Sequence, residues 1–257
     1  RNLAVEVVSI KDAGLRAKLK TPEEIADVDF SKIRGATLEI QNTIFVLEEL
    51  TKAFDELPFP DEHNVQTNLQ PDIRFIFGPP GTGKTTYLAH EEIQPAMLAD
   101  DPLKVLVLTP TNKAADVLVQ KVQKICGESP DWLIRFGTTS EIGIENAGLL
   151  KDSNYDIFGK DHFCVVTTIT RFPYDGFNHG SIDYKFKNIA WDVIIVDEAS
   201  MIGVAYMAYL LEQQKQAQFV IGGDPFQIEP VVFAEDWKGE NIYSMVRLDA
   251  FDPVLQR

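Results

Sequence analysis

The chain has little cysteine and histidine, and none of either is spaced like a metal site. Among its 257 residues there are two cysteines, Cys126 and Cys164, and four histidines. Both cysteines lie in or beside apolar segments, so we expect buried, reduced thiols rather than a disulfide or a metal site. The four histidines are scattered and do not have the spacing of zinc ligands. They are His63, His90, His162 and His179.

Long hydrophobic runs are also missing. No apolar stretch approaches the roughly 20 residues that a membrane-spanning helix needs. The first residues lack the charged start and the long apolar segment of a secretory signal. Because 45% of the residues are hydrophobic, the chain can still bury a full core. We therefore expect a cytoplasmic globular protein with one large domain, an accessory piece and no membrane partner.

Basic residues are scarce relative to acidic ones. The chain has 39 Asp and Glu against 24 Lys and Arg, a formal net charge of -15. Such a charge repels polyanions, so any nucleic-acid binding must use a local groove and be weak and salt-sensitive. An acidic surface that keeps the protein soluble accounts for the total charge.

What the chain does contain is a phosphate-binding motif. The run FIFGPPGTGKTT, residues 75–86, fills the pattern G-x-x-x-x-G-K-[ST] between a strand-like stretch, 73–77, and a helix-like one, 85–93. Glycines allow a tight turn whose N–H groups point inward, the lysine ammonium reaches the outer phosphates, and the threonine hydroxyl ligates magnesium. The predicted nucleotide cradle consists of Gly78, Pro79, Pro80, Gly81, Thr82, Gly83, Lys84, Thr85 and Thr86.

A second motif, VIIVDEAS over residues 193–200, ends an apolar strand in two carboxylates. Adjacent acids at a buried strand tip are costly unless a cation or water satisfies them. Asp197 fits the magnesium position, and Glu198 fits the base that orients or deprotonates the attacking water. The alternative is a strand that ends in a solvated acidic turn.

A third motif, VIGGDPFQIEP over residues 220–230, leads another strand into a glycine turn. The neutral amide of Gln227 suits hydrogen bonding to a γ-phosphate or to the attacking water, so that it senses nucleotide state. An ordinary turn is the alternative. We predict that Lys84, Glu198 and Gln227 are the catalytic residues.

Around these motifs, short apolar strands alternate with helical patterns. Continuous apolar runs are typical of parallel sheets covered on both faces. We predict an α/β fold, a RecA-like P-loop NTPase with a doubly wound parallel sheet. The predicted strands are 73–77, 104–109, 163–168, 192–197 and 218–222, and the predicted helices are 113–125 and 204–214.

The first 57 residues form a predicted β/α accessory segment. Alternating patterns over 3–10 and 15–20 predict a hairpin, and apolar residues at helical spacing over 36–57 predict an amphipathic helix. The proline-rich stretch 58–71 reads as a linker. We therefore expect the nucleotide domain to occupy residues 72–257.

Together the motifs resemble the first RecA-like domain of superfamily 1 DNA/RNA helicases, in the branch of the nonsense-decay helicase and its bacterial relatives. GPPGTGKTT resembles motif I, LTPTNKAADVL motif Ia, VVTTITR motif Ic, DEAS motif II and GGDPFQIEP motif III. The resemblance implies an ATP hydrolase that uses Mg2+ and translocates on single-stranded DNA or RNA. Lys84 and Thr85 would hold phosphates and metal, with Asp197 as the second metal ligand.

The resemblance also implies a strand-binding surface. Hydroxyls and a helix N-terminus suit backbone phosphates and carry little sequence readout. A helix-capping role for Thr111 or Asn112 is the compatible alternative. Aromatics between residues 171 and 186 either stack on bases or, more commonly, pack the loop. The residues that the resemblance assigns to nucleic acid are Thr109, Pro110, Thr111, Asn112, Thr167 and Thr168.

Two departures limit these expectations. No glutamine lies at the usual spacing before Gly78 for the adenine-reading element, and the chain ends at Arg257 before a second RecA-like domain. That domain, in a missing C-terminal part or a partner chain, would supply an arginine finger worth roughly a thousandfold or more in hydrolysis. We expect this chain alone to bind nucleotide, hydrolyse it feebly and unwind nothing. The other hypothesis is an ATP-dependent switch or assembly subunit with the same fold and no translocation.

Overall fold

The computed structural model describes residues 5–11, 14–19, 48, 51–52, 72–127, 129–230 and 237–248. The chain divides into two compact units, Arg1–Asn42 and Thr43–Arg257. In the first unit, β1 (Val5–Lys11) pairs antiparallel with β2 (Gly14–Leu19), so the predicted hairpin is confirmed. The linker predicted over 58–71 lies outside the described residues, as does most of the helix predicted over 36–57.

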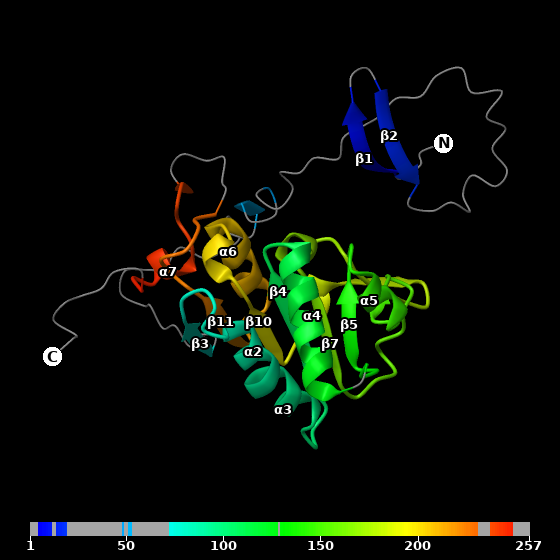
Figure 1. Cartoon of the computed structure of the whole chain (residues 1–257), viewed down its shortest axis with the longest axis horizontal. Helices are drawn as coiled ribbons and strands as arrows, with labels where there is room; N and C mark the ends of the chain where they lie inside the picture. Colours follow the sequence, from blue (N-terminus) through cyan, green and yellow to red (C-terminus); the bar gives the residue numbers. More distant parts are fainter. Residues whose placement is uncertain are drawn as a thin grey trace. The chain divides into compact units, whose positions relative to one another are not determined.

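The second unit is built on a seven-stranded sheet in which all strand pairs are parallel (Figure 1). Its spatial order is β3-β11-β10-β4-β7-β5-β6. The sequence patterns placed five of these strands within one residue at each end. The strands are β3 (Ile73–Phe77), β4 (Lys104–Thr109), β5 (Leu133–Phe136), β6 (Leu150–Lys151), β7 (Phe163–Thr168), β10 (Val193–Val196) and β11 (Gln218–Gly223).

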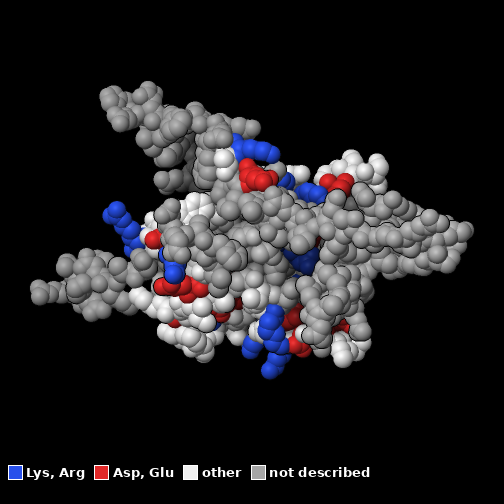
Figure 2. All heavy atoms as spheres, turned by 90° about the horizontal axis from the view of Figure 1, so that it is seen from above, with Lys and Arg blue, Asp and Glu red and all other residues white. Residues whose placement is uncertain are grey.

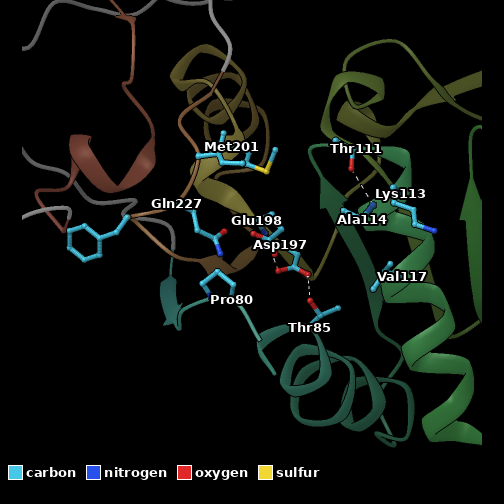
Figure 3. Close-up of a pocket in the computed structure, with 12 residues that line it drawn as sticks. Pro80, Thr85, Thr111, Lys113, Ala114, Val117, Asp197, Glu198, Met201 and Gln227 are labelled. Atoms are coloured by element: carbon cyan, nitrogen blue, oxygen red, sulfur yellow. Dashed lines mark hydrogen bonds between the residues drawn. The ribbon is translucent and has the colours of Figure 1, made fainter. Parts of the chain in front are cut away.

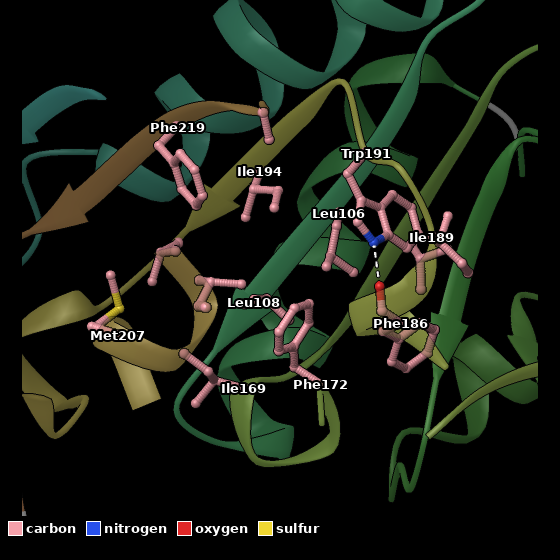
Figure 4. Close-up of a cluster of buried hydrophobic side chains, with 14 of the residues drawn as sticks. Leu106, Leu108, Ile169, Phe172, Phe186, Ile189, Trp191, Ile194, Met207 and Phe219 are labelled. Atoms are coloured by element: carbon pink, nitrogen blue, oxygen red, sulfur yellow. Dashed lines mark hydrogen bonds between the residues drawn. The ribbon is translucent and has the colours of Figure 1, made fainter. Parts of the chain in front are cut away.

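Helices cover both faces of this sheet, so the predicted doubly wound, RecA-like P-loop fold is confirmed. Because side chains alternate along a strand, Val107 lies in one buried cluster with Leu118, and its neighbour Leu108 lies in the other with Met207. Figure 4 shows part of the second cluster. The first face carries α2 (Lys84–Tyr87), the π-helical η3 (Leu88–Ile93), α3 (Gln94–Met97) and α4 (Asn112–Cys126), and the second carries α6 (Val204–Gln213).

The aromatic segment after β7 packs inside the protein. Phe172, Phe177 and Phe186 are buried, and the last two meet Phe136 edge to face at centroid distances of 5.2 and 4.9 Å. The loop-packing interpretation is therefore confirmed, and base stacking is wrong for these three residues. The same segment contains a hairpin that the sequence patterns did not predict, β8 (Gly176–His179) and β9 (Ile182–Lys185).

Short elements complete the described part of the chain. Within that part, no helix has the length and apolar character needed to cross a bilayer. The remaining helices are α5 (Ile142–Asn146) and α7 (Ile242–Met245), with single turns at η4 (Ile169–Arg171), η5 (Phe186–Asn188) and η6 (Ala199–Met201).

Candidate functional site

The loop between β3 and α2 is a tight turn closed by its own hydrogen bonds. Thr82 donates to the carbonyl of Pro79 through its backbone N, at 3.3 Å, and through Oγ1, at 2.7 Å. Gly83 precedes α2 with φ of 91°, a left-handed conformation that residues with a Cβ rarely adopt. The loop thus delivers the chain directly into the N-terminus of a helix, where backbone N–H groups favour an anion.

Lys84, the first residue of α2, lies against this loop. Its side chain is almost buried, and Nζ donates to the carbonyl oxygens of Gly78 and Pro79. The ammonium is therefore held next to the turn that the sequence predicts to cradle phosphates. Its contact with the outer phosphates remains a prediction.

Thr85 and Asp197, predicted as the metal ligands, are in direct contact. Thr85 Oγ1 donates to Asp197 Oδ2 at 2.9 Å. Asp197 is 2% exposed, and burial raises its pKa from 3.8 to about 6, although the hydrogen bond from Thr85 opposes the shift. A hydroxyl and a carboxylate are the hard oxygen ligands that Mg2+ takes together with substrate phosphates and water. The pair therefore fits the predicted ion.

Glu198 occupies a strained backbone position at the same strand end. Its φ of 54° and ψ of 42° are left-handed, which is uncommon for a residue with a long side chain. Its backbone N donates to Asp197 Oδ1 at 2.9 Å. Strain of this kind clusters at functional sites, where the surrounding structure maintains it.

Residues from all three nucleotide motifs line one cleft of about 640 Å³ (Figure 3). Thr85, Asp197, Glu198 and Gln227 contribute polar groups from three different segments. The start of α4 adds Thr111 and Lys113 to the wall. The tertiary structure thus brings together the residues that the sequence predicted as metal ligands, water-orienting base and phosphate sensor.

The predicted nucleic-acid residues divide into exposed and buried ones. Thr111 is exposed and caps α4, because its side chain accepts from the backbone N of Ala114 at 3.1 Å. The capping interpretation is confirmed. Asn112 is also exposed, and Pro110 is partly so. These three residues remain available for a nucleic-acid contact.

Direct contact is not supported for the others. Thr109 and Thr167 are fully buried, and Thr168 is 5% exposed. Thr109 Oγ1 donates to the carbonyl of Thr111 at 2.9 Å, so it stabilises the turn from inside. The prediction of a strand-binding surface therefore needs correction at these three threonines, because each belongs to a strand covered on both faces.

Sequence reasoning missed several residues near the site. Lys113, in the wall of the cleft, forms an ion pair with Glu141. The Tyr243 ring packs near Phe75 and Phe77, and its buried hydroxyl has no hydrogen-bond partner within the described ranges. Burial raises the pKa of this phenol, and the nearby carboxylates raise it further. No local pattern marks such a residue.

A family model described as an AAA domain, AAA_19, matches residues 61–233, more than half of the chain. The chain belongs to this AAA-domain family. Its matched segment contains the phosphate loop, the two acids and Gln227.

Relatives of this AAA-domain chain include RecBCD enzyme subunits and RNA helicases. The RecBCD enzyme subunit RecD of Buchnera aphidicola is 26% identical over 219 residues, which are 82% of this chain and 32% of RecD. The RNA helicase Mov10l1 of Homo sapiens is 27% identical over 61% of this chain and 13% of its own length. With the five motifs, these matches identify the chain as a RecA-like domain of the superfamily 1 helicase type.

A solved structure is more distantly similar. The arterivirus nonstructural protein 10 (helicase) in complex with DNA is 19% identical, with a TM-score of 0.35, over 62% of this chain and 30% of the viral chain. This AAA-domain chain thus spans about a third or less of the length of each protein compared.

Proposed function

We propose that this chain binds ATP with Mg2+ and hydrolyses it as the first of two RecA-like domains that translocate along single-stranded DNA or RNA. The observation that carries the proposal is the contact between Thr85 and Asp197 inside a cleft that Glu198 and Gln227 also line. These residues come from the three motifs that nucleotide hydrolysis requires.

Each residue has a distinct task. Backbone N–H groups of the loop before α2 and Lys84 bind the phosphates, whereas Thr85 and Asp197 hold the metal ion. When bound, Mg2+ neutralises charge on the phosphate oxygens. Glu198 orients or deprotonates the attacking water, and the Gln227 amide donates to the γ-phosphate or to that water without adding negative charge.

A second domain completes the motor in this proposal. Phe226 and Ile228 are 58% and 70% exposed at the cleft, an arrangement suited to cover by another protein surface. A covering domain that brings an arginine to the γ-phosphate accelerates hydrolysis by roughly a thousandfold or more. We expect feeble hydrolysis and no unwinding from residues 1–257 alone.

The test measures binding and hydrolysis separately. A fluorescent ATP analogue is titrated with and without Mg2+, and turnover is followed by phosphate release. Lys84→Ala should lose nucleotide binding, and Glu198→Gln should retain binding but lose hydrolysis. Lys121→Ala, at an exposed lysine of α4, is the matched control. If Lys84→Ala leaves nucleotide affinity unchanged, the proposed nucleotide site is wrong. Duplex unwinding by this chain alone would refute the need for a second domain.

The charge distribution favours one competing function, an ATP-dependent switch without translocation. Figure 2 shows acidic side chains beside basic ones on the described part of the face in view, with no continuous basic band there. The net charge of -15 points the same way. With the second domain supplied, single-stranded nucleic acid stimulates ATP hydrolysis if the protein is a motor and leaves it unchanged if it is a switch.

A further inference from the structure

Arg135, in the middle of β5, is fully buried. Its Nε donates to Asp116 Oδ1 on α4 at 2.7 Å, and Asp116 is itself only 2% exposed. Burial lowers the pKa of the guanidinium, and Asp116 opposes that shift. A buried ion pair is often no more stabilising than apolar residues of similar volume. The hydrogen bonds that the guanidinium donates to other groups therefore explain why a charged residue occupies this position.

The remaining donors of Arg135 connect two surface segments. Nη2 donates to Asn112 Oδ1 at 3.0 Å and to the carbonyl of Thr138 at 2.8 Å, and Nη1 donates to the carbonyl of Phe136. Asn112 is the first residue of α4, and Thr138 lies in the turn after β5. One rigid planar group thus ties the start of α4 to that turn.

Further hydrogen bonds extend the same connection. Asp116 Oδ2 accepts from Thr139 Oγ1 at 2.9 Å, so Asp116 also binds the turn. On the other side, Arg171 Nη2 donates to Thr138 Oγ1 at 3.3 Å. Arg171 ends the turn η4 that follows β7. The segment 137–139 therefore bridges the segment after β7 and the segment after β4, which carries the exposed candidates Thr111 and Asn112.

We propose that Arg135 is a positioning residue for single-stranded nucleic acid, which holds Asn112 and the 137–139 turn in one geometry without itself touching the strand. The inference rests on the nucleic-acid binding in the proposed function. Preorganised polar groups bind a strand without the entropic cost of ordering them. None of the Arg135 hydrogen-bond partners lines the nucleotide cleft, although Thr111 and Lys113 on either side of Asn112 do. Nucleotide affinity should therefore depend on this residue much less than oligonucleotide affinity does.

Two variants and one control separate positioning from mere stability. Arg135→Met combined with Asp116→Leu removes both charges and leaves neither buried alone. Arg135→Lys keeps a charge beside Asp116, but a single ammonium does not reproduce the planar fork. Val122→Ala is the control, because Val122 is a buried residue of α4 with no part in the polar network. Thermal unfolding shows whether the control is destabilised to the same degree as the variants.

The measurements are the affinity for a fluorescent single-stranded oligonucleotide at low salt and the affinity for the fluorescent ATP analogue. We expect oligonucleotide affinity to fall about tenfold in both Arg135 variants, the equivalent of about one hydrogen bond to a charged group. Nucleotide affinity should stay within about twofold of wild type. The Val122→Ala variant should keep both affinities.

Three results would overturn the inference. Oligonucleotide affinity could be unchanged in the Arg135 variants, or it could fall equally in the Val122→Ala control, which would show a purely structural role. If the wild-type chain binds the ATP analogue but no oligonucleotide, the nucleic-acid part of the proposed function fails together with the inference. Loss in the Arg135 variants alone supports the inference.

Discussion

Asp197→Asn should stabilise the metal-free protein at neutral pH. The Asp197 carboxyl is 2% exposed, and burial raises its pKa from 3.8 to about 6. A shift of about two units at about 1.36 kcal/mol each sets a ceiling of roughly 3 kcal/mol on the cost of the ionised form. Because the pKa of Asp197 is higher in the folded state, its protonated form adds to the free energy of unfolding. This contribution is complete below pH 3.8 and is lost as the pH rises through about 6. At pH 7.5 the folded protein is therefore destabilised by the full free-energy cost of ionising Asp197.

Asparagine removes this charge at the cost of one mismatched contact. The asparagine carbonyl oxygen can still accept the hydrogen bond from the Thr85 hydroxyl. Its NH2 group then faces the backbone N–H of Glu198, which in the wild type donates to Asp197 Oδ1, so two donors meet. We therefore expect a net gain of about 1–2 kcal/mol in the free energy of unfolding at pH 7.5. The gain should shrink toward pH 5, because wild-type Asp197 takes up a proton in the folded state.

Urea unfolding in EDTA between pH 5 and 7.5 measures this difference. Asp101→Asn, at an exposed carboxylate, makes the same change in net charge and is the control. With ATP and Mg2+ the order should reverse, since the variant lacks a metal ligand. A variant no more stable than the control at pH 7.5, or a gain that is the same at every pH, would refute the reasoning.

Three further substitutions test the packing around the site. Gly223→Ala places a Cβ 2.6 Å from Tyr243 Oη and should lower the free energy of unfolding by about 1–3 kcal/mol, measured by thermal unfolding. Adding Tyr243→Phe should recover part of this loss, because it removes the clashing hydroxyl. Glu198→Gly should raise stability to urea by about 1 kcal/mol by relieving the left-handed backbone, and abolish hydrolysis; equal or lower stability would argue against strain. Arg135→Met alone should cost roughly 3–5 kcal/mol, because it leaves Asp116 buried and unpaired, and pairing it with Asp116→Leu should restore most of the loss; circular dichroism melts would expose a failure to recover.

Local sequence was sufficient for much of the fold. The strands 73–77, 104–109 and 163–168 were predicted with the bounds that the structure shows. The continuous apolar runs over 104–109 and 163–168 are buried on both faces, so the pattern carries the information by itself. The phosphate loop was equally clear, because its glycines and lysine stand at a spacing that the chemistry demands.

One strand, β5, could not be predicted from its hydrophobic pattern because it contains a charged residue. β5 was not predicted, because Arg135 interrupts its apolar run. A buried arginine is compatible with a strand only if a partner such as Asp116 approaches from another element. Periodicity does not contain that information.

Thus the sequence by itself determined the αβ alternation, the phosphate loop and the identities of the polar residues at the strand ends. Only the tertiary structure decided which of them meet. Thr85 and Asp197 are 112 residues apart and in contact, and Thr109 is buried whereas Thr111 is exposed. The physical reason is that local patterns specify which face of an element is buried, whereas contacts between elements depend on strand order and register across the whole sheet.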